Sequence, residues 1–324
     1  MNYYLYKLKF DTAVHFGASD SALSLYTSED HFCADTLFSA LCHTALSLSG
    51  QKGLDELCAH AENGELLLSD AMPWKGERFY LPKPCVSSQG KREVSASQRK
   101  AVKKLNWIPV EQFARFSESV HGGEMFDAES VKTEFGVSGE MAKVQIVPEN
   151  DALPYQVGLF RFAEDAGLWF IAGCASEEQG EKLNKLIDSL GISGIGGKIS
   201  SGYGKFSVED VIYLNEPFDN VTEWLCDALT NESHKRYLLL SASLPNDNEL
   251  EKLLPTAEYR LIRRSGFVQS EDYSPDSRKK IPPIFLAAGS VLENKFSPVL
   301  YEVGQTGQHP VYRFSAPVFL GVNL

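Results

Sequence analysis

Hydrophobic and polar residues alternate near the start of the chain, which predicts an opening β-strand over residues 3–16. One face of that strand carries Tyr4, Tyr6, Leu8 and Phe10. Beyond residue 28 the apolar residues recur at intervals of three and four, as in an amphipathic helix, at Leu37, Phe38, Leu41, Ala45 and Leu48. Asp35 stands just before this run and is predicted to cap the helix, and Gly50 is predicted to end it.

Extended and helical segments then alternate in the order of a split β-α-β unit. The predicted elements are a short helix at 54–62, strands at 65–70 and 78–82, a hairpin at 155–162 and 168–174, a helix at 178–190 and a strand at 204–214. A long polar insertion at about 85–154 interrupts this series. We therefore predict an α+β fold whose first domain spans 1–215 and is ferredoxin-like, with that insertion inside it.

The second part of the chain shows a similar but less regular order of helices and strands. It has a linker helix at 221–230, a strand at 237–244, a short helix at 248–254 and strands at 258–270, 282–286, 290–293 and 311–322. No repeat is visible in the sequence itself, so this duplication depends on element order alone. We predict a second ferredoxin-like domain at 216–324, in tandem with the first.

A glycine-rich run between the predicted helix at 178–190 and the next strand is the most informative segment of the chain. Residues 191–206 contain six glycines, three serines and two lysines. Glycine tolerates positive φ, so such a loop can turn tightly and bring its amides against an anion. The spacing fits neither a Walker loop nor a Rossmann fingerprint, which disfavours ATP and NAD. The alternative is a turn that only lets a helix pack closely on a sheet.

Composition and charge narrow the class of protein. With 324 residues and a formal net charge of −12, the chain can hold two cores and is a poor non-specific binder of long nucleic acid. No apolar run reaches the roughly 20 residues of a membrane span, and no signal peptide is visible, so we predict a cytoplasmic protein without membrane contact. The six cysteines show no C-x-x-C spacing, so we predict no metal and no cofactor.

Two local basic segments stand out against this acidic background, and each is alternatively a solvated face. Between residues 85 and 109, six cations face the single anion Glu93, and they are Lys91, Arg92, Arg99, Lys100, Lys103 and Lys104. Residues 260–280 contain three acidic residues and six more cations. These cations are Arg260, Arg263, Arg264, Arg278, Lys279 and Lys280. Such a distribution suits a short, defined nucleic-acid site.

Together these features resemble the RAMP superfamily of CRISPR–Cas RNA-binding proteins. The matching motifs are His15-Phe16-Gly17, the helix start at 28–41, the glycine-rich loop ending at Phe206, and the pair formed by 259–267 and 287–292. Within the superfamily the whole chain is similar to the group that forms the fourth Csm subunit of type III-A effector complexes.

The resemblance implies two RNA-recognition-like ferredoxin folds in tandem, with a thumb-like insertion in the first. It implies a non-catalytic subunit that caps the 5′ handle of the mature CRISPR RNA in antiviral defence. It also implies two protein partners, the large polymerase-like subunit and the first backbone RAMP subunit. The glycine-rich loop would hold handle phosphates and bases, and the basic insertion around 99–107 would form the thumb or its base.

The residues predicted to contact RNA fall into three groups. The first is the loop itself, with Gly194, Gly196, Gly197, Lys198, Ser200, Ser201, Gly202, Tyr203, Gly204 and Lys205. The second is the basic insertion, with Arg99, Lys103, Lys104 and Trp107, and the third comprises His15, Arg263 and Arg264. Single-stranded RNA is read by stacking its bases on aromatic faces, so Tyr203, Trp107 and His15 are the predicted stacking partners. For Trp107 and His15 the alternative is a core or structural role.

An enzymatic alternative stays open at this point, namely a RAMP endoribonuclease that processes CRISPR RNA or cleaves target RNA. Its general acid or base would be His15 or His31, or it would use Asp35 as the catalytic aspartate. We favour the capping role for Asp35 and predict no catalytic residue, because no catalytic constellation is visible in the sequence. A third alternative is an adaptor that touches only proteins, against which the loop and the basic segments both count.

Overall fold

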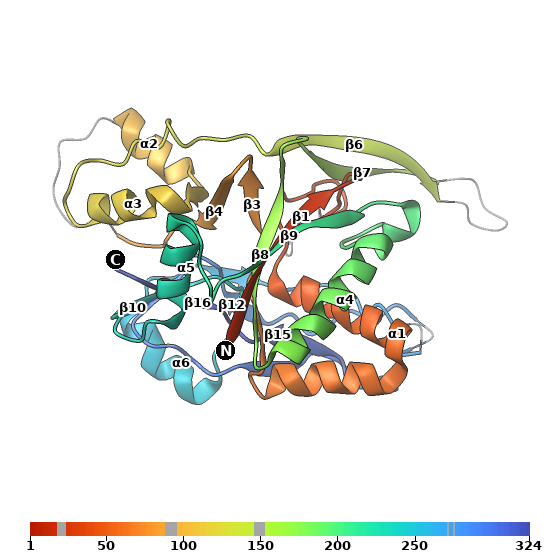
Figure 1. The fold of residues 1–324 in the computed structure, drawn as a ribbon. Coiled ribbons are helices and arrows are strands. Elements are labelled where there is room, and N and C mark those ends of the chain that lie inside the picture. Colours follow the sequence, from red (N-terminus) through yellow and green to blue (C-terminus); the bar gives the residue numbers. More distant parts are fainter. Residues whose placement is uncertain (18–23, 88–95, 146–152, 271, 275) are drawn as a thin grey trace.

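Seven strands form the main sheet of the molecule, and β1 (Asn2–Phe10) lies second from one edge of it (Figure 1). The structure is a computed structural model, and it describes residues 1–17, 24–87, 96–145, 153–270, 272–274 and 276–324. The strand order is β5-β4-β3-β8-β1-β9, and β2 pairs with the same edge of β8 as β3 does. The other strands are β2 (Leu66–Leu68), β3 (Met72–Lys75), β4 (Arg78–Pro82), β5 (Trp107–Pro109), β8 (Ala166–Cys174) and β9 (Phe206–Tyr213).

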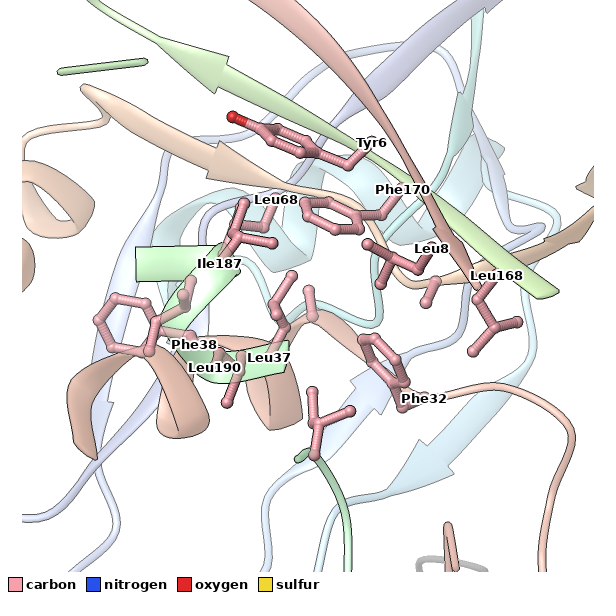
Figure 2. Close-up of a cluster of buried hydrophobic side chains, with 14 of the residues drawn as sticks. Tyr6, Leu8, Phe32, Leu37, Phe38, Leu68, Leu168, Phe170, Ile187 and Leu190 are labelled. Atoms are coloured by element: carbon pink, nitrogen blue, oxygen red, sulfur yellow. The ribbon is translucent and has the colours of Figure 1, made fainter. Parts of the chain in front are cut away.

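Two helices, α1 (Ala34–Glu62) and α4 (Glu177–Ser193), cover one face of this sheet. In Figure 2 their side chains meet those of the strands in one buried cluster, which includes Tyr6, Leu8, Phe32, Leu37, Phe38, Leu68, Leu168, Phe170, Ile187 and Leu190. The alternation along β1 sends Tyr6 and Leu8 into this layer and Leu5 into the opposite one. The predicted opening strand is confirmed up to Phe10 but not over 11–16, and helices are present where they were predicted before Gly50, at 54–62 and at 178–190.

The opposite face of the sheet packs against elements from both halves of the chain. These are the 3₁₀ turn η1 (Val110–Gln112), α3 (Phe113–Val120), α5 (Asn220–Thr230) and a three-stranded sheet of order β13-β10-β16. The small sheet contains β10 (Arg236–Leu239), β13 (Val291–Leu292) and β16 (Phe319–Val322). Every residue of β8 is buried, because both faces of that strand are covered.

The rest of the second half consists of short elements: α6 (Asp247–Leu253), η3 (Leu254–Thr256), β11 (Leu261–Arg263), β12 (Ile284–Leu286), β14 (Val299–Glu302) and β15 (Tyr312–Ser315). The strand predicted at 311–322 is two strands, since β15 pairs with β14 while β16 pairs with β10. β15 lies on α1, where the rings of Phe314 and Phe38 stack 4.7 Å apart. Among the described residues no helix is both long and apolar enough to cross a membrane.

A two-stranded ribbon, β6 (Gly136–Gln145) with β7 (Leu153–Phe162), projects beside the main sheet (Figure 1). The predicted hairpin between 155–162 and 168–174 is wrong, because β7 pairs with β6 while β8 pairs with β1. The two segments are adjacent in sequence, but their burial differs. β8 is apolar on both faces and belongs inside the sheet, whereas the first residues of β7 are exposed.

The start of α1 is capped from a distance. The N-cap residue, Cys33, makes no side-chain cap hydrogen bond, and the Ala34 amide instead donates to Asp70 Oδ1 at 2.8 Å. The same oxygen accepts the Ala242 amide at 3.0 Å, so Asp70 joins the two halves of the chain. The capping role predicted for Asp35 is therefore wrong, whereas Gly50 does interrupt the helix, with φ of 65°.

Asp70 gives a first testable prediction, on stability. Asp70→Ala should lower the free energy of unfolding by about 2–4 kcal/mol, because two buried amides lose their acceptor. Burial raises the pKa of Asp70 to about 6, because it disfavours the charged carboxylate. The stability that comes from the protonated carboxyl is therefore fully present below about pH 4, and it is lost as pH rises through the folded pKa. Asp70→Asn keeps the acceptor oxygen and should lack this loss. Denaturant unfolding at pH 4 and pH 7 measures this loss of stability. The same pH dependence in the wild type and in Asp70→Asn would contradict the role assigned to the buried Asp70 carboxyl.

Candidate nucleic-acid interface

The glycine-rich loop follows α4 and contains the 3₁₀ turn η2 (Ile199–Ser201). Four of its glycines, Gly194, Gly196, Gly202 and Gly204, have positive φ, a region that side chains disfavour. Lys198 is also left-handed, with φ of 63°, and it is the one non-glycine residue in the described part of the chain with positive φ. The composition of the loop is thus explained by its backbone conformation.

The loop is built directly on residues 13–16. The amide of Gly204 donates to Ala13 O at 2.9 Å, and the amide of Gly197 donates to His15 O at 2.8 Å. A Cβ at Gly197 would lie 2.5 Å from His15 Cδ2, and one at Gly204 would collide with Ile195 O. Close packing therefore accounts for these two glycines.

Five further amides of the loop have no hydrogen-bond acceptor within the described part of the chain, namely those of Gly196, Lys198, Ile199, Ser200 and Tyr203. The left-handed Lys198 is followed by the right-handed η2 turn, so successive amides from 198 to 200 form a concave nest. Nests of this kind bind anions.

The ribbon supplies the other wall of this surface. Lys198 Nζ lies 4.9 Å from the ring centroid of Tyr155 on β7 and donates to its hydroxyl at 3.4 Å. Lys143 Nζ on β6 lies 4.6 Å from the ring centroid of Tyr203, whose hydroxyl donates to Met141 Sδ at 2.8 Å. Two lysine–tyrosine pairs therefore stand beside the nest, each combining a cation with an aromatic face.

Sequence reasoning missed Lys143 and Tyr155 as site residues. Tyr155 was expected at the start of a strand, but the partner of that strand was misassigned, so nothing connected it with the loop. The segment 137–145 gives no period-2 signal, because its large apolar residues Val137, Met141 and Val144 recur at intervals of four and three, as in a helix. A ribbon prediction there would have brought Lys143 to the same face as Tyr155, its register partner.

His15 lies beneath the loop and is not a stacking surface. Its exposed fraction is 8%, and its Nδ1 lies 2.7 Å from Gly158 O on β7. Because its own carbonyl accepts the Gly197 amide, His15 joins the ribbon to the loop. Burial lowers the pKa of His15, and the nearby charge of Lys198 acts in the same direction. The neutral ring, donating from Nδ1, therefore fits this position, and the predicted stacking role is replaced by a positioning role.

The basic insertion lies elsewhere. Arg99, Lys103 and Lys104 are on α2 (Ala96–Lys104), at the opposite end of the molecule from the C-terminal end of α4, where the loop begins (Figure 1). The ammonium of Lys83 holds the C-terminal end of α2 by donating to Val102 O at 2.8 Å and Lys103 O at 3.2 Å. These cations do not belong to the surface formed by the loop and the ribbon. Lys91 and Arg92 fall outside the described residues.

Trp107 is also part of the packing rather than the loop surface. It contacts both large hydrophobic clusters, and the His31 ring meets it edge-on with centroids 5.2 Å apart. His31 Nδ1 lies 2.9 Å from Asp30 Oδ1, and together with Glu29 these side chains offer ligand atoms within 4.8 Å of one another. Acidic groups at a surface turn are common without a bound ion, and we assign no role to them.

Arg264 is buried in an ionic cluster and does not face solvent. Its Nε donates to Asp35 Oδ2 at 3.1 Å and its Nη2 donates to Oδ1 at 2.6 Å, while Arg313 Nη1 also donates to Oδ2. Burial alone would raise the pKa of Asp35, but the two guanidinium groups hold it well below its usual range. The predicted RNA contact of Arg264 is therefore withdrawn, whereas Arg263 is exposed on β11.

The arrangement as a whole can bind a phosphate and stack a base next to it. The nest at 198–200 offers amides, Lys198 and Lys205 add positive charge, and Tyr155 and Tyr203 offer rings. Asp35, with a fully buried carboxylate, is remote from solvent and does not belong to this surface.

Comparison with known proteins gives a consistent picture. Residues 7–207 match the RAMP superfamily, and residues 232–322 match the CRISPR Csm4 C-terminal domain. The chain is 37% identical to the CRISPR system Cms protein Csm4 of Mycobacterium tuberculosis (strain CDC 1551 / Oshkosh), over 99% of this chain and 98% of the relative. It is 32% identical to the protein of that name from Streptococcus thermophilus, with 100% of both chains covered.

Solved structures show the same fold. One chain of the Csm3–Csm4 subcomplex in the type III-A CRISPR–Cas interference complex superposes with a TM-score of 0.64, at 15% identity and with 100% of both chains covered. One chain of the Csm1–Csm4 cassette in complex with pppApA gives a TM-score of 0.60, at 18% identity, with 99% of this chain and 98% of that chain covered. With full-length relatives above 30% identity and a RAMP match over more than half its length, the chain belongs to the Csm4 family of the RAMP superfamily.

Proposed function

We propose that this protein is a non-catalytic subunit of a type III-A CRISPR effector complex, in which it caps the 5′ handle of the mature CRISPR RNA. The proposal is carried by the amides at 198–200, which have no acceptor among the described residues and lie beside two lysine–tyrosine pairs. Amides and lysines suit the phosphates of a single strand, and the tyrosine rings suit its bases. Such a complex would act in the cytoplasm.

Two protein partners belong to the proposal, the large polymerase-like subunit and the first backbone RAMP subunit. Its support is that the similar structures are of Csm1–Csm4 and Csm3–Csm4 assemblies. In the complex this chain would link the two partners at the handle end of the RNA.

The finer description of the fold is part of the same proposal. The order β9-β1-β8-β2 with α1 and α4 on one face is the arrangement expected of a ferredoxin-like domain, which supports assigning 1–215 to such a unit. The three-stranded sheet around β10 would be the reduced counterpart within 216–324. We assign the thumb-like projection to the ribbon β6–β7 in place of α2, because the ribbon lies beside the loop.

The endoribonuclease alternative finds little support in the geometry of its candidate residues. Both carboxylate oxygens of Asp35 are engaged by arginines, and the side chain is fully buried. His15 is held under the loop, and His31 is packed against Trp107. None of the three presents a free acid or base to a strand bound at the nest. The cations of α2 stay a prediction as RNA contacts, on a separate surface.

Binding of handle RNA tests the proposed function. Lys198→Ala with Lys205→Ala should weaken binding about 100-fold or more, since each lost phosphate contact removes a charge-assisted hydrogen bond. The slope of log K against log salt should shrink by about 1.4, the value for two phosphate contacts on a single strand. The probe is a synthetic copy of the RNA that copurifies with the complex, measured by filter binding.

The matched control is Lys52→Ala with Lys252→Ala. It removes two exposed lysines that are far from the loop in sequence. The control double variant should keep both the affinity and the salt slope of the wild type. Equal affinity of the loop variant and the control, with both proteins folded, would exclude the loop as the site of the handle.

A further inference from the structure

The helix α1 turns back on itself at Gly50, where the backbone leaves the helical region with φ of 65° and ψ of −162°. Figure 1 shows the two helical segments that result, and we call residues 34–49 the first arm and residues 51–62 the second arm. A Cβ at Gly53 would lie 3.2 Å from Ala45 O, eight residues earlier in the chain. A straight helix would separate such residues by about 12 Å, so the second arm packs against the first.

Two cysteines occupy matching places on these arms. Cys42 lies eight residues before Gly50, and Cys58 lies eight residues after it. Both side chains are half-buried, and both pack against the hydrophobic cluster that contains Leu37 and Phe38. The Cys42 thiol donates a hydrogen bond to the sulfur of Cys58, and neither residue is in a disulfide. The turn of α1 therefore brings two reduced thiols from separate arms into contact.

The surroundings make the two thiols chemically unequal. The hydrogen bond from Cys42 stabilises a thiolate at Cys58 and lowers the pKa of Cys58. Burial and the carboxylates of Asp55 and Glu62 act in the opposite direction but more weakly. The same hydrogen bond, with burial, raises the pKa of Cys42 well above its usual range, although Lys280 lies nearby. Because the thiolate is the reactive form of cysteine, Cys58 is the expected nucleophile.

We propose that Cys42 and Cys58 form a peroxide-reactive dithiol, which closes to a disulfide across the turn of α1. The thiols already touch, so the bond requires movement of the side chains rather than of the arms. The inference is independent of the proposed function, because it concerns neither the loop nor RNA.

The oxidant is a hydroperoxide, of which hydrogen peroxide is the simplest. The Cys58 thiolate attacks one peroxide oxygen, the O–O bond breaks, and hydroxide leaves while Cys58 becomes a sulfenic acid. The Cys42 sulfur then attacks the Cys58 sulfur, the S–O bond breaks, and the oxygen leaves as water with the proton of Cys42. The hydroxide takes up the proton that Cys58 lost. In sum, two thiols lose two electrons, and one peroxide is reduced to two waters.

The disulfide would clamp the second arm to the first. The second arm also holds α4, because Lys182 Nζ on α4 donates to Glu56 Oε1 at 2.6 Å. We expect the oxidised protein to unfold at a temperature about 5 °C or more above that of the reduced protein, since the bridge closes a loop of about 15 residues. An unchanged unfolding temperature after the bridge has formed would overturn the clamp.

Thiol counting on the full chain tests the dithiol. The reduced protein, freed of reductant, is treated with equimolar hydrogen peroxide, and the remaining thiols are then alkylated. Two thiols should be lost, and peptide mass spectrometry should find Cys42 joined to Cys58 by a bond that a dithiol reductant removes. No bridge, or bridges that join other cysteines equally often, would overturn the proposal.

Single variants separate the roles of the two thiols. In Cys42→Ser the oxidation should stop at a sulfenic acid on Cys58, which a dimedone probe captures. In Cys58→Ser the thiol of Cys42 should react much more slowly, and equally fast capture at both positions would contradict the assigned nucleophile. The matched control is Cys85→Ser with Cys226→Ser, which removes two other half-buried free cysteines. It should form the bridge as the wild type does, and circular dichroism checks that each variant is folded.

Discussion

Asp35→Asn is expected to lower the free energy of unfolding by about 3–5 kcal/mol, because it leaves two buried arginines without their counter-charge. Arg264, which directly follows β11, and Arg313 on β15 both donate to this carboxylate. The loss should therefore loosen the contact between α1 and the second half of the chain. Asp188→Asn on the exposed side of α4 serves as the control and should stay within about 0.5 kcal/mol of the wild type.

The pH dependence follows from the direction of the pKa shift. Because folding lowers the pKa of Asp35, its contribution is present above about pH 3.9 and is lost as pH falls below that value toward the folded pKa. Denaturant unfolding between pH 3 and pH 7 should show the difference between wild type and variant shrinking at the acid end. A loss no larger than that of the control at pH 7 would contradict the ionic cluster.

The same variant also addresses catalysis. Under conditions where the variant is still folded, target cleavage by the assembled complex should continue, since the carboxylate is fully buried and bound to arginines. Loss of cleavage by a folded Asp35→Asn protein, together with RNA cutting by the purified wild-type subunit, would reinstate the endoribonuclease alternative.

Gly204→Ala is expected to reduce handle affinity by about 100-fold or more, because the added methyl group collides with the backbone of the loop. At Gly204 φ is +76°, and a Cβ would meet Ile195 O well inside contact distance. The collision would break the hydrogen bond from the Gly204 amide to Ala13 O and displace the neighbouring Tyr203. The nest and both lysine–tyrosine pairs depend on this position of the loop.

Gly202→Ala is the matched control, since Gly202 also has positive φ, +84°, but a Cβ there meets nothing within 4 Å. This variant adds only the backbone strain of about 1–2 kcal/mol and keeps the packing. Filter binding at fixed salt compares the two, and thermal unfolding checks that the sheet is intact. Equal affinities of Gly204→Ala and Gly202→Ala for handle RNA would mean that close packing of the loop is not required for RNA binding.

Features with a local periodic signal could be predicted from the sequence. The alternation of β1, the three-and-four spacing of α1 and the glycine run after α4 each depend on neighbours within a few residues. The pairing of β7 could not be predicted in this way, because β7 and β8 are both extended and adjacent. Only burial of β8 on both faces separates them.

The residues of the candidate site could likewise be predicted only in part from the sequence. The loop was predicted because its glycines lie close together in the sequence, and His15 was singled out, but it positions the loop and does not stack. The burial of Arg264 depends on Asp35, which is 229 residues away, so a basic segment in the sequence could not reveal it. Lys143 and Tyr155 reach the loop only through the pairing of the ribbon with itself.

The stacking of Phe314 on Phe38 has a consequence for how the chain is made. Translation proceeds from the N-terminus, and domains that emerge first ordinarily fold first. Here Phe314 and Ala316 belong to the same buried cluster as Leu37 and Phe38. The outer side of α1 therefore stays uncovered until the ribosome has delivered almost the whole polypeptide. A nascent chain stopped before β15 would expose an apolar helix, and the N-terminal half made alone would be a poor candidate for independent expression.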